Sequence, residues 1–185
     1  MIASSDVRLR AAEPEDLELA YVLENDTELW PYGSNTMPFS RFALKQFLEN
    51  TTGDIYADHQ VRLTIERREV EDKWTPVGFA DLFNFDPRHH RAEIGLALLP
   101  AWRGLNIGEQ AVRLLMDYAA IIDLHMIYAI IAVDNEKASR MFERLGFLAS
   151  AQLCDWLWNG TSYIEARMWQ AIIYRDRDRL RASRP

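Results

Sequence analysis

A strand, a glycine-containing loop and a helix follow one another near the middle of the chain, and this succession constrains the fold more than any other feature. Residues 92–99 form an apolar run, and the loop at residues 102–108 (WRGLNIG) comes directly before a helix pattern. Apolar residues recur in that pattern at spacings of 3, 4 and 3, at Val112, Leu115, Ala119 and Ile122. A β-branched apolar run at residues 126–133 then predicts a buried strand. A strand–helix–strand unit of this kind predicts an α/β chain built around a central sheet.

The rest of the chain carries further strand and helix signals. Alternating or apolar runs predict strands at residues 7–12, 60–66, 76–85, 151–158 and 163–168. A proline followed by acidic residues predicts a helix start at residues 13–16, and further helices are expected at residues 41–49 and 135–145, the last ending at Gly146. The last two strands flank Asn159-Gly160, a dipeptide favoured in tight hairpins.

Two local patterns define the first helices more closely. Leu17, Ala20, Val22 and Leu23 are spaced so that they form one apolar face. In the second helix, Phe39 and Leu44 enclose Ser40 as a hydrophobic staple around an N-cap, and Phe47 and Leu48 continue the apolar face.

Length and cysteine content set the class of protein. At 185 residues the chain fits one domain, with a core at residues 6–170 and a charged tail at residues 171–185 that we expect to fray. The single cysteine allows no internal disulfide, which favours a reducing compartment. We find no signal-peptide pattern and no run of 18 apolar residues, so we expect a cytoplasmic protein without a membrane span.

The net charge of −7 limits the partners that the protein can bind. Binding to a phosphate backbone needs a basic face, so a nucleic acid is not expected as the main partner. An acidic surface is compatible with a cationic substrate. Solubility alone also explains it, and this is the favoured explanation.

The loop at residues 103–109 has the features of an anion site. Backbone N–H groups and the positive end of a helix dipole converge at such a position, and Arg103 adds a charge. Gly104 and Gly108 leave room for a pyrophosphate, and Asn106 tolerates left-handed backbone angles better than most residues. Two glycines also fit a plain connector between strand and helix, so the loop alone does not decide between the two.

A second segment favours a pyrophosphate site over a plain connector. Arg103, Asn106 and Gly108 fall on the signature of the GCN5-related N-acetyltransferases (GNAT family), which is Arg or Gln, two residues, Gly, one residue, then Gly or Ala; here Asn106 replaces the first glycine. The segment DNEKASRMFERLGF at residues 134–147 resembles the family's next segment, in which an asparagine opens a short helix. The region from residue 91 to 168 is most similar to the spermidine N-acetyltransferase and RimJ/RimL-like branch.

This resemblance implies a fold, a reaction and a set of binding residues. The fold is a central mixed, mostly antiparallel twisted sheet, splayed between two central strands and flanked by helices. The reaction is direct acetyl transfer from acetyl-coenzyme A to an amine, without a metal. The residues that the resemblance assigns to the co-substrate are Leu96, Ala97, Leu98, Arg103, Gly104, Leu105, Asn106, Ile107, Gly108, Glu109, Asn135, Ser139 and Phe142. Leu96 and Leu98 also suit a plain core role, and Asn135 also suits a helix cap.

The proton transfers of this reaction point to Glu93 and Ser139. Glu93 matches a position where relatives carry a glutamate base, and burial in an apolar strand raises the pKa of a carboxyl group toward a useful value. A structural glutamate satisfied by Arg91 or a backbone donor is the alternative. Phe142 stands where the family has a tyrosine that acts as the acid, and Ser139 lies one helical turn earlier, where it suits a proton relay or a solvated surface.

The acceptor is less constrained by the sequence. Carboxylates for a polyamine or another small amine are available at Glu24, Asp26 and Glu28, which otherwise form a solvated helix end. The nearby aromatic residues either line an acceptor pocket or belong to the core: Trp30, Tyr32 and Phe39. A protein N-terminus or an amino-acid-like amine is the second acceptor class. A non-catalytic acyl-CoA-binding module is the alternative to an enzyme. The branch also implies a homo-oligomer, a dimer or larger.

Two remaining features suggest chemistry that we do not expect. His89 and His90 are adjacent on one strand pattern, so they cannot both point inward, and no ligand-spaced partners accompany them; we expect no metal. Cys154 is not needed as a nucleophile because direct transfer uses no acyl-enzyme, and we expect it to be a buried, inert thiol.

Overall fold

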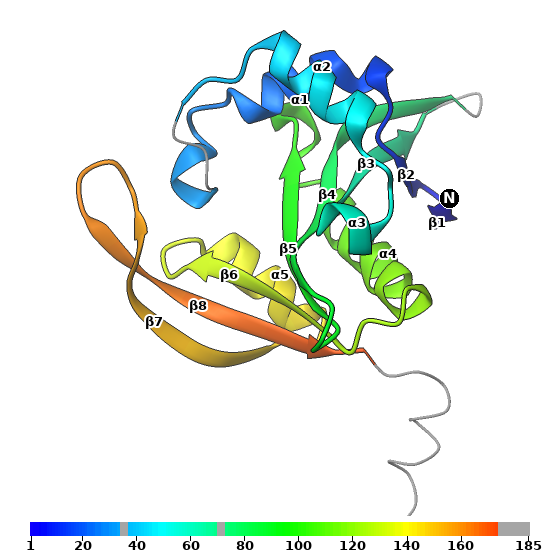
Figure 1. Cartoon of the computed structure of the whole chain (residues 1–185). Helices are drawn as coiled ribbons and strands as arrows, with labels where there is room; N and C mark the ends of the chain where they lie inside the picture. The colour runs from blue at the N-terminus through cyan, green and yellow to red at the C-terminus, as the bar shows by residue number, and fades with distance from the viewer. Residues whose placement is uncertain (34–36, 70–72, 174–185) are drawn as a thin grey trace, which may run out of the picture.

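One twisted sheet organises the molecule. The computed structural model describes residues 1–33, 37–69 and 73–173, and within them eight strands are ordered β1-β2-β3-β4-β5-β6-β8-β7 (Figure 1). The strands are β1 (Ile2–Ala3), β2 (Val7–Ala11), β3 (Val61–Arg68), β4 (Trp74–Asp86), β5 (Arg91–Leu98), β6 (Met126–Ala132), β7 (Leu148–Trp158) and β8 (Tyr163–Ile172). Neighbouring strands are antiparallel except β5 and β6, which are parallel. The predicted mixed, mostly antiparallel sheet is confirmed.

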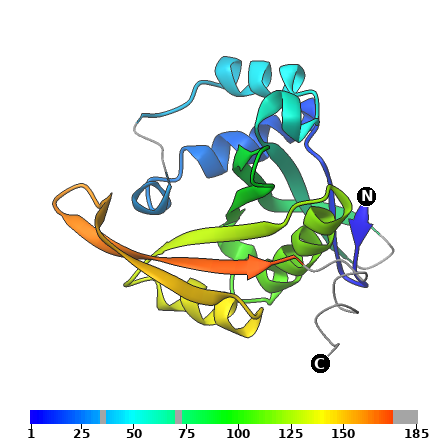
Figure 2. The same ribbon diagram turned by 60° about the horizontal axis from the view of Figure 1, so that its bottom comes forward.

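Helices cover both faces of this sheet. The helices are α1 (Leu17–Glu24), α2 (Arg41–Asn50), α3 (Ile55–Asp58), α4 (Ile107–Ile121) and α5 (Glu136–Arg144). Figures 1 and 2 show α1 and α2 together on one side of β4 and β5, with α4 on the other side. No helix within the described ranges is long and apolar enough to cross a membrane.

Strand alternation separates two apolar cores. Phe79 and Ala97, opposite each other on β4 and β5, pack with α1 and α2. The next pair, Ala80 and Leu96, points to the other face and packs in the core that contains α4. Side chains of a strand alternate between its faces, so the two cores lie on opposite faces of β4 and β5.

The helix boundaries follow the sequence signals. The Ser40 side chain accepts a hydrogen bond from the backbone N–H of Ala43 at 3.1 Å and caps α2 as predicted. In α4, Val112, Leu115 and Ala119 are fully buried, which confirms the predicted apolar face. Gly146 follows α5 with a φ of +86°, a left-handed angle that ends a helix readily in glycine.

Some expectations were wrong in detail. Val22 is 51% exposed because it lies outside the buried face of α1, and Phe39 is too exposed to close a full staple. At the last hairpin, Asn159 pairs with Ser162, so Gly160 and the residue after it form the tip. The short elements β1 and α3 were not predicted. The division into a core at residues 6–170 and a tail stays a prediction. Most of the expected tail lies outside the described residues.

A buried ionic cluster joins β2, β3 and the start of α1. Asp16 is 3% exposed, and its carboxylate accepts two hydrogen bonds from Arg10 at 2.7 Å each and one from the Thr64 hydroxyl at 2.8 Å. Glu66 bridges Arg8 and Arg10 on the neighbouring strand. Burial alone raises the pKa of Asp16, but the hydrogen bonds from Arg10, the Glu13 backbone and Thr64 outweigh burial and hold it below its usual value.

Candidate active site

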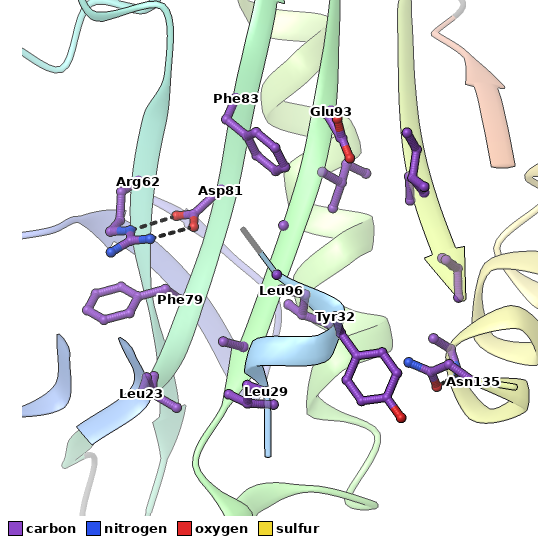
Figure 3. Close-up of a pocket in the computed structure, with 18 of the residues that line it drawn as sticks. Leu23, Leu29, Tyr32, Arg62, Phe79, Asp81, Phe83, Glu93, Leu96 and Asn135 are labelled. Atoms are coloured by element: carbon purple, nitrogen blue, oxygen red, sulfur yellow. Dashed lines mark hydrogen bonds and ion pairs between the residues drawn. The ribbon is translucent and has the colours of Figure 1, made fainter. Parts of the chain in front are cut away.

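The central cavity lies where β5 and β6 separate. The two strands pair at only three positions, the last of which joins Glu93 and Tyr128. Beyond that pair the strands diverge, and a cavity of about 420 Å³ is lined from both sides of the gap (Figure 3). The expected splay between two central strands is therefore present, and it opens into this cavity.

The β5 wall is formed by residues predicted to contact the donor. Leu96 and Ala97 line the cavity, and Leu98 packs in the adjacent core. The Leu99 N–H donates to the Val77 carbonyl, and hydrogen-bonding directions alternate along an antiparallel pair. The backbone groups of Leu96 and Leu98 consequently point away from β4, toward the gap.

The loop before α4 presents unpaired backbone amides. Asn106 adopts left-handed angles (φ 61°, ψ 11°) at the helix N-cap, with no side-chain capping bond. In the described part of the chain, the backbone N–H groups from Gly104 to Glu109 have no hydrogen-bond partner. A Cβ atom at Gly108 would lie 3.1 Å from the Leu96 side chain, so a larger residue here would require that side chain to move. Free amides at a helix N-terminus fit a pyrophosphate.

The two charged residues of this loop are engaged in ion pairs. The Arg103 side chain donates to the Leu98 carbonyl at 2.9 Å and pairs with Asp26 at 3.1 Å, which fixes the loop against the end of β5 and α1. The Glu109 carboxylate pairs with Arg113 and Arg144, each at 3.1 Å. These pairs leave the backbone amides of the loop as its most direct anion contacts.

Glu93 lies at the apex of the gap and is held by two donors. The Asn84 side-chain amide donates to its carboxylate at 2.9 Å, and the Tyr128 hydroxyl forms a second hydrogen bond. Burial raises the pKa of Glu93, and the two donors oppose that shift because they favour the charged form. Arg91 pairs with Asp86 and not with Glu93. Sequence reasoning missed both Asn84 and Tyr128.

Helix α5 forms the far side of the cavity. The Asn135 side chain accepts from the Ala138 N–H at 3.2 Å, so it caps the helix while also lining the cavity. Phe142 lines the cavity and packs edge-on against Phe147 at 4.8 Å between ring centroids. Ser139 is not among the described lining residues, so its proposed part in catalysis stays a prediction.

The opposite end of the cavity carries charge. Arg62 on β3 forms two hydrogen bonds with Asp81 on β4, at 3.0 and 2.9 Å (Figure 3). A third joins Arg62 to Glu24 at 2.6 Å. Of the three predicted acceptor carboxylates only Glu24 lines the cavity; Asp26 pairs with Arg103, and Glu28 is exposed. Sequence reasoning missed Arg62 and Asp81, because their contact depends on the register of β3 and β4.

Of the three predicted acceptor aromatics, one reaches the cavity. Tyr32 lines the cavity. The Trp30 indole instead donates to the Glu24 carbonyl at 2.9 Å, at the end of α1. Phe39 is fixed through its backbone to Asn25 and does not line the cavity.

This geometry has a counterpart among known proteins. The family described as "Acetyltransferase (GNAT) domain" matches residues 6–148. The chain belongs to the GNAT acetyltransferase family. The match contains the β5–loop–α4 unit and the β5–β6 gap, which are the structural parts described above. As a GNAT acetyltransferase, the protein uses acetyl-coenzyme A as its co-substrate.

Relatives within the GNAT family are similar along most of the chain. The spermidine N(1)-acetyltransferase of Escherichia coli (strain K12) is 28% identical over 154 residues, which cover 83% of this chain and 78% of that protein. The spermidine N(1)-acetyltransferase of Vibrio cholerae is 28% identical over 155 residues, or 82% of this chain and 84% of that protein.

Solved structures share the GNAT fold. The spermidine N-acetyltransferase from Vibrio cholerae in complex with CoA and spermine superposes with a TM-score of 0.81 at 23% identity, covering 92% of this chain and 97% of that chain. A dodecameric structure of the Vibrio cholerae enzyme superposes with a TM-score of 0.74 at 21% identity, covering 98% and 100%. At this identity the likeness establishes the fold.

No histidine or cysteine is among the described residues that line the cavity. Within the described residues, no cluster of three His, Cys, Asp or Glu side chains is placed to hold a metal ion. The His90 ring contacts the Asp123 carbonyl at 3.1 Å in the turn between β4 and β5. Cys154 was expected to be buried, but it is exposed because it lies on the edge strand β7.

Proposed function

We propose that the protein transfers the acetyl group of acetyl-coenzyme A directly to a primary amine of a polyamine or another small amine. The observation that carries the proposal is the charge of the cavity wall. Arg62 pairs with Glu24 and Asp81, and Glu93 lines the same cavity elsewhere, so the wall carries three carboxylates and one guanidinium. A cavity with excess negative charge attracts an ammonium group and raises its local concentration.

The donor would enter between β5 and β6. The amides from Gly104 to Glu109 would bind the pyrophosphate, with the α4 dipole adding a partial positive charge. The backbone of β5 at Leu96 and Leu98 would pair with the amide groups of the pantetheine arm. Asn135 would contact the same arm from the N-terminus of α5.

Glu93 would act as the base. An amine attacks a thioester only when it is neutral, so a group in the cavity must accept a proton from the ammonium form. The raised pKa of Glu93 makes it a stronger proton acceptor than an ordinary glutamate, and the bond from Asn84 holds one carboxylate oxygen in place. Each carboxylate oxygen can accept more than one hydrogen bond, so the carboxylate can also take the proton of the amine, directly or through a bridging water.

The relatives favour a polyamine among the small amines. Those from Escherichia coli and Vibrio cholerae are named spermidine N(1)-acetyltransferases, and one solved structure of the latter holds CoA and spermine. A peptide N-terminus is the second acceptor class, and it also presents a cationic amine to the same carboxylates. We place the reaction in the cytoplasm.

A thiol-release assay tests the proposed function. Purified protein and acetyl-coenzyme A would be given spermidine, spermine, a simple diamine, a monoamine of equal length and a peptide with a free N-terminus. We expect turnover with the polyamines, less with the monoamine, and a mass increase of one acetyl group on the acceptor. CoA binding without turnover of any amine would refute the proposal. Turnover of the peptide alone would move the acceptor to the second class.

We also propose that the chain forms a homo-oligomer, a dimer or larger. The β7–β8 hairpin exposes large apolar side chains to more than half of their full extent: Leu148, Trp156, Trp158 and Tyr163. The Trp158 and Tyr163 rings lie next to each other, with centroids 5.1 Å apart, and exposed apolar side chains that gather in this way mark a protein interface. Sedimentation equilibrium should give a mass of two or more chains, and a monomer at micromolar concentration would contradict the proposal.

A further inference from the structure

Glu93 can accept a proton in the cavity, but α5, the helix on which the family carries its proton-donating tyrosine, has no tyrosine here. The position of the usual tyrosine is Phe142, whose ring is 4% exposed and packs on Phe147. The nearest hydroxyl on α5, Ser139, is not among the described lining residues. When acetyl transfer breaks the carbon–sulfur bond, the sulfur leaves with the electron pair and needs a proton from some other element.

Tyr32 is the one hydroxyl-bearing side chain among the described residues that line the cavity. It lies on the short helical turn η2 (Trp30–Tyr32), on the opposite wall from α5. Figure 3 shows its ring reaching across the gap toward Asn135, with the hydroxyl at the leading end. Asn135 is the residue that we place beside the pantetheine arm, so Tyr32 approaches the donor end of the cavity.

The turn that carries Tyr32 is fixed by several bonds. The Tyr32 N–H donates to the Leu29 carbonyl at 3.0 Å, and the Gly33 N–H donates to the Trp30 carbonyl at 3.1 Å. The Trp30 indole donates to the Glu24 carbonyl at 2.9 Å, which ties the turn to the end of α1. Proline at position 31 further restricts the backbone. Tyr32 is therefore held at the cavity rather than carried on a free loop.

We infer that Tyr32 donates the proton to the departing sulfur of coenzyme A, in place of the phenol that the family carries where Phe142 stands. The inference rests on the proposed function. Glu93 takes the ammonium proton and releases it to solvent water, which leaves the amine neutral and the carboxylate free again. The amine nitrogen then forms a bond to the acetyl carbon and passes its second proton to Glu93, the carbon–sulfur bond breaks, and the phenol proton moves to sulfur to give the free thiol. Because Tyr32 is half exposed, water returns a proton to the phenolate.

The first test replaces Tyr32 by phenylalanine, which keeps the ring and removes the proton. We expect kcat for spermidine acetylation to fall about 100-fold, within the range typical of a lost acid, while the Kd for coenzyme A stays within a factor of about two. Tyr56→Phe is the matched control, because Tyr56 has the same 50% exposure and lies away from the cavity against Phe85. Wild-type kcat in Tyr32→Phe would overturn the inference.

The second test moves the phenol back to α5. The double variant Tyr32→Phe/Phe142→Tyr should recover at least tenfold of the lost kcat, because position 142 lines the same cavity. A merely structural role of Tyr32 predicts no recovery, so a double variant as slow as the single variant would overturn the inference. Wild-type turnover is measured first: if no amine is acetylated, the proposed function fails, whereas normal turnover with an unaffected Tyr32→Phe variant removes only this proton donor.

Discussion

Replacement of Glu93 by glutamine should decide whether this residue is a catalytic base or a structural glutamate. Glutamine keeps the size of the side chain and still accepts the hydrogen bond from Asn84, so the fold should tolerate it. A primary amine with a lysine-like pKa of about 10.4 is neutral in about one molecule in 10³ at pH 7.4. Without a base only this fraction reacts, so we expect kcat/KM to fall about 10³-fold, or about 4 kcal/mol of barrier.

The pH profile gives a sharper test than the rate at one pH. Glu93 must be deprotonated to act, and burial raises its pKa, so the wild-type rate should fall as pH drops through a value above the ordinary glutamate range. In Glu93→Gln this acidic limb of the pH profile, the fall in rate at low pH, should vanish. Log kcat/KM should instead rise by about one per pH unit from pH 6 to 9, as the neutral amine becomes more abundant. In Asn84→Ala the limb should move to higher pH, because the lost donor favoured the charged carboxylate.

Thiol release under saturating acetyl-coenzyme A is the suitable assay, with the concentration of spermidine varied at each pH. Glu49→Gln is the control, because Glu49 is half exposed on α2, pairs with Lys45 and does not line the cavity. An unaltered pH profile in Glu93→Gln would refute the reasoning and leave Glu93 as a structural residue.

Three further predictions concern the donor site, the acceptor site and stability. Gly108→Trp should raise the Kd for coenzyme A more than 100-fold in calorimetry, because even a Cβ meets Leu96 at 3.1 Å; unchanged affinity would make the loop a connector. Asp81→Asn should raise KM about tenfold, or 1.4 kcal/mol, for a diamine but much less for a monoamine of equal length; equal effects would remove Asp81 from acceptor recognition. Asp16→Ala should lose about 3 kcal/mol in urea unfolding at pH 7, because it leaves buried partners unpaired. The pKa of Asp16 is lowered in the folded state, so the difference from wild type should be complete above about pH 4, the unfolded-state value, and shrink as pH falls below it; a pH-independent difference would count against the ionic origin.

The donor half of the site was predictable from local sequence. The strand before the loop, the amphipathic helix after it and the asparagine that opens α5 each have a short-range signal, because period and capping are properties of neighbouring residues. The structure places these elements with boundaries within a few residues of the prediction. The gap between the parallel strands β5 and β6, by contrast, was expected only from the family resemblance.

The acceptor half could not be predicted in the same way. Arg62 and Asp81 stand directly opposite each other on β3 and β4, so their contact depends on strand register. Glu24 joins them from α1, a separation of 38 residues from Arg62. Register and helix placement are set by tertiary packing, and a single sequence contains no local signal for them. The same reason explains why Asn84 and Tyr128, the donors to Glu93, were missed.

Asn106 has a consequence for how such proteins are recognised. Its backbone angles are those that a glycine would adopt, although the residue carries a side chain. The family's glycine is thus needed for its left-handed backbone angles, and asparagine can adopt the same angles at a small energetic cost. A search that required the glycine letter would discard this chain. A search for the left-handed angle before the helix would retain it, and Asn106→Gly should be an almost silent exchange.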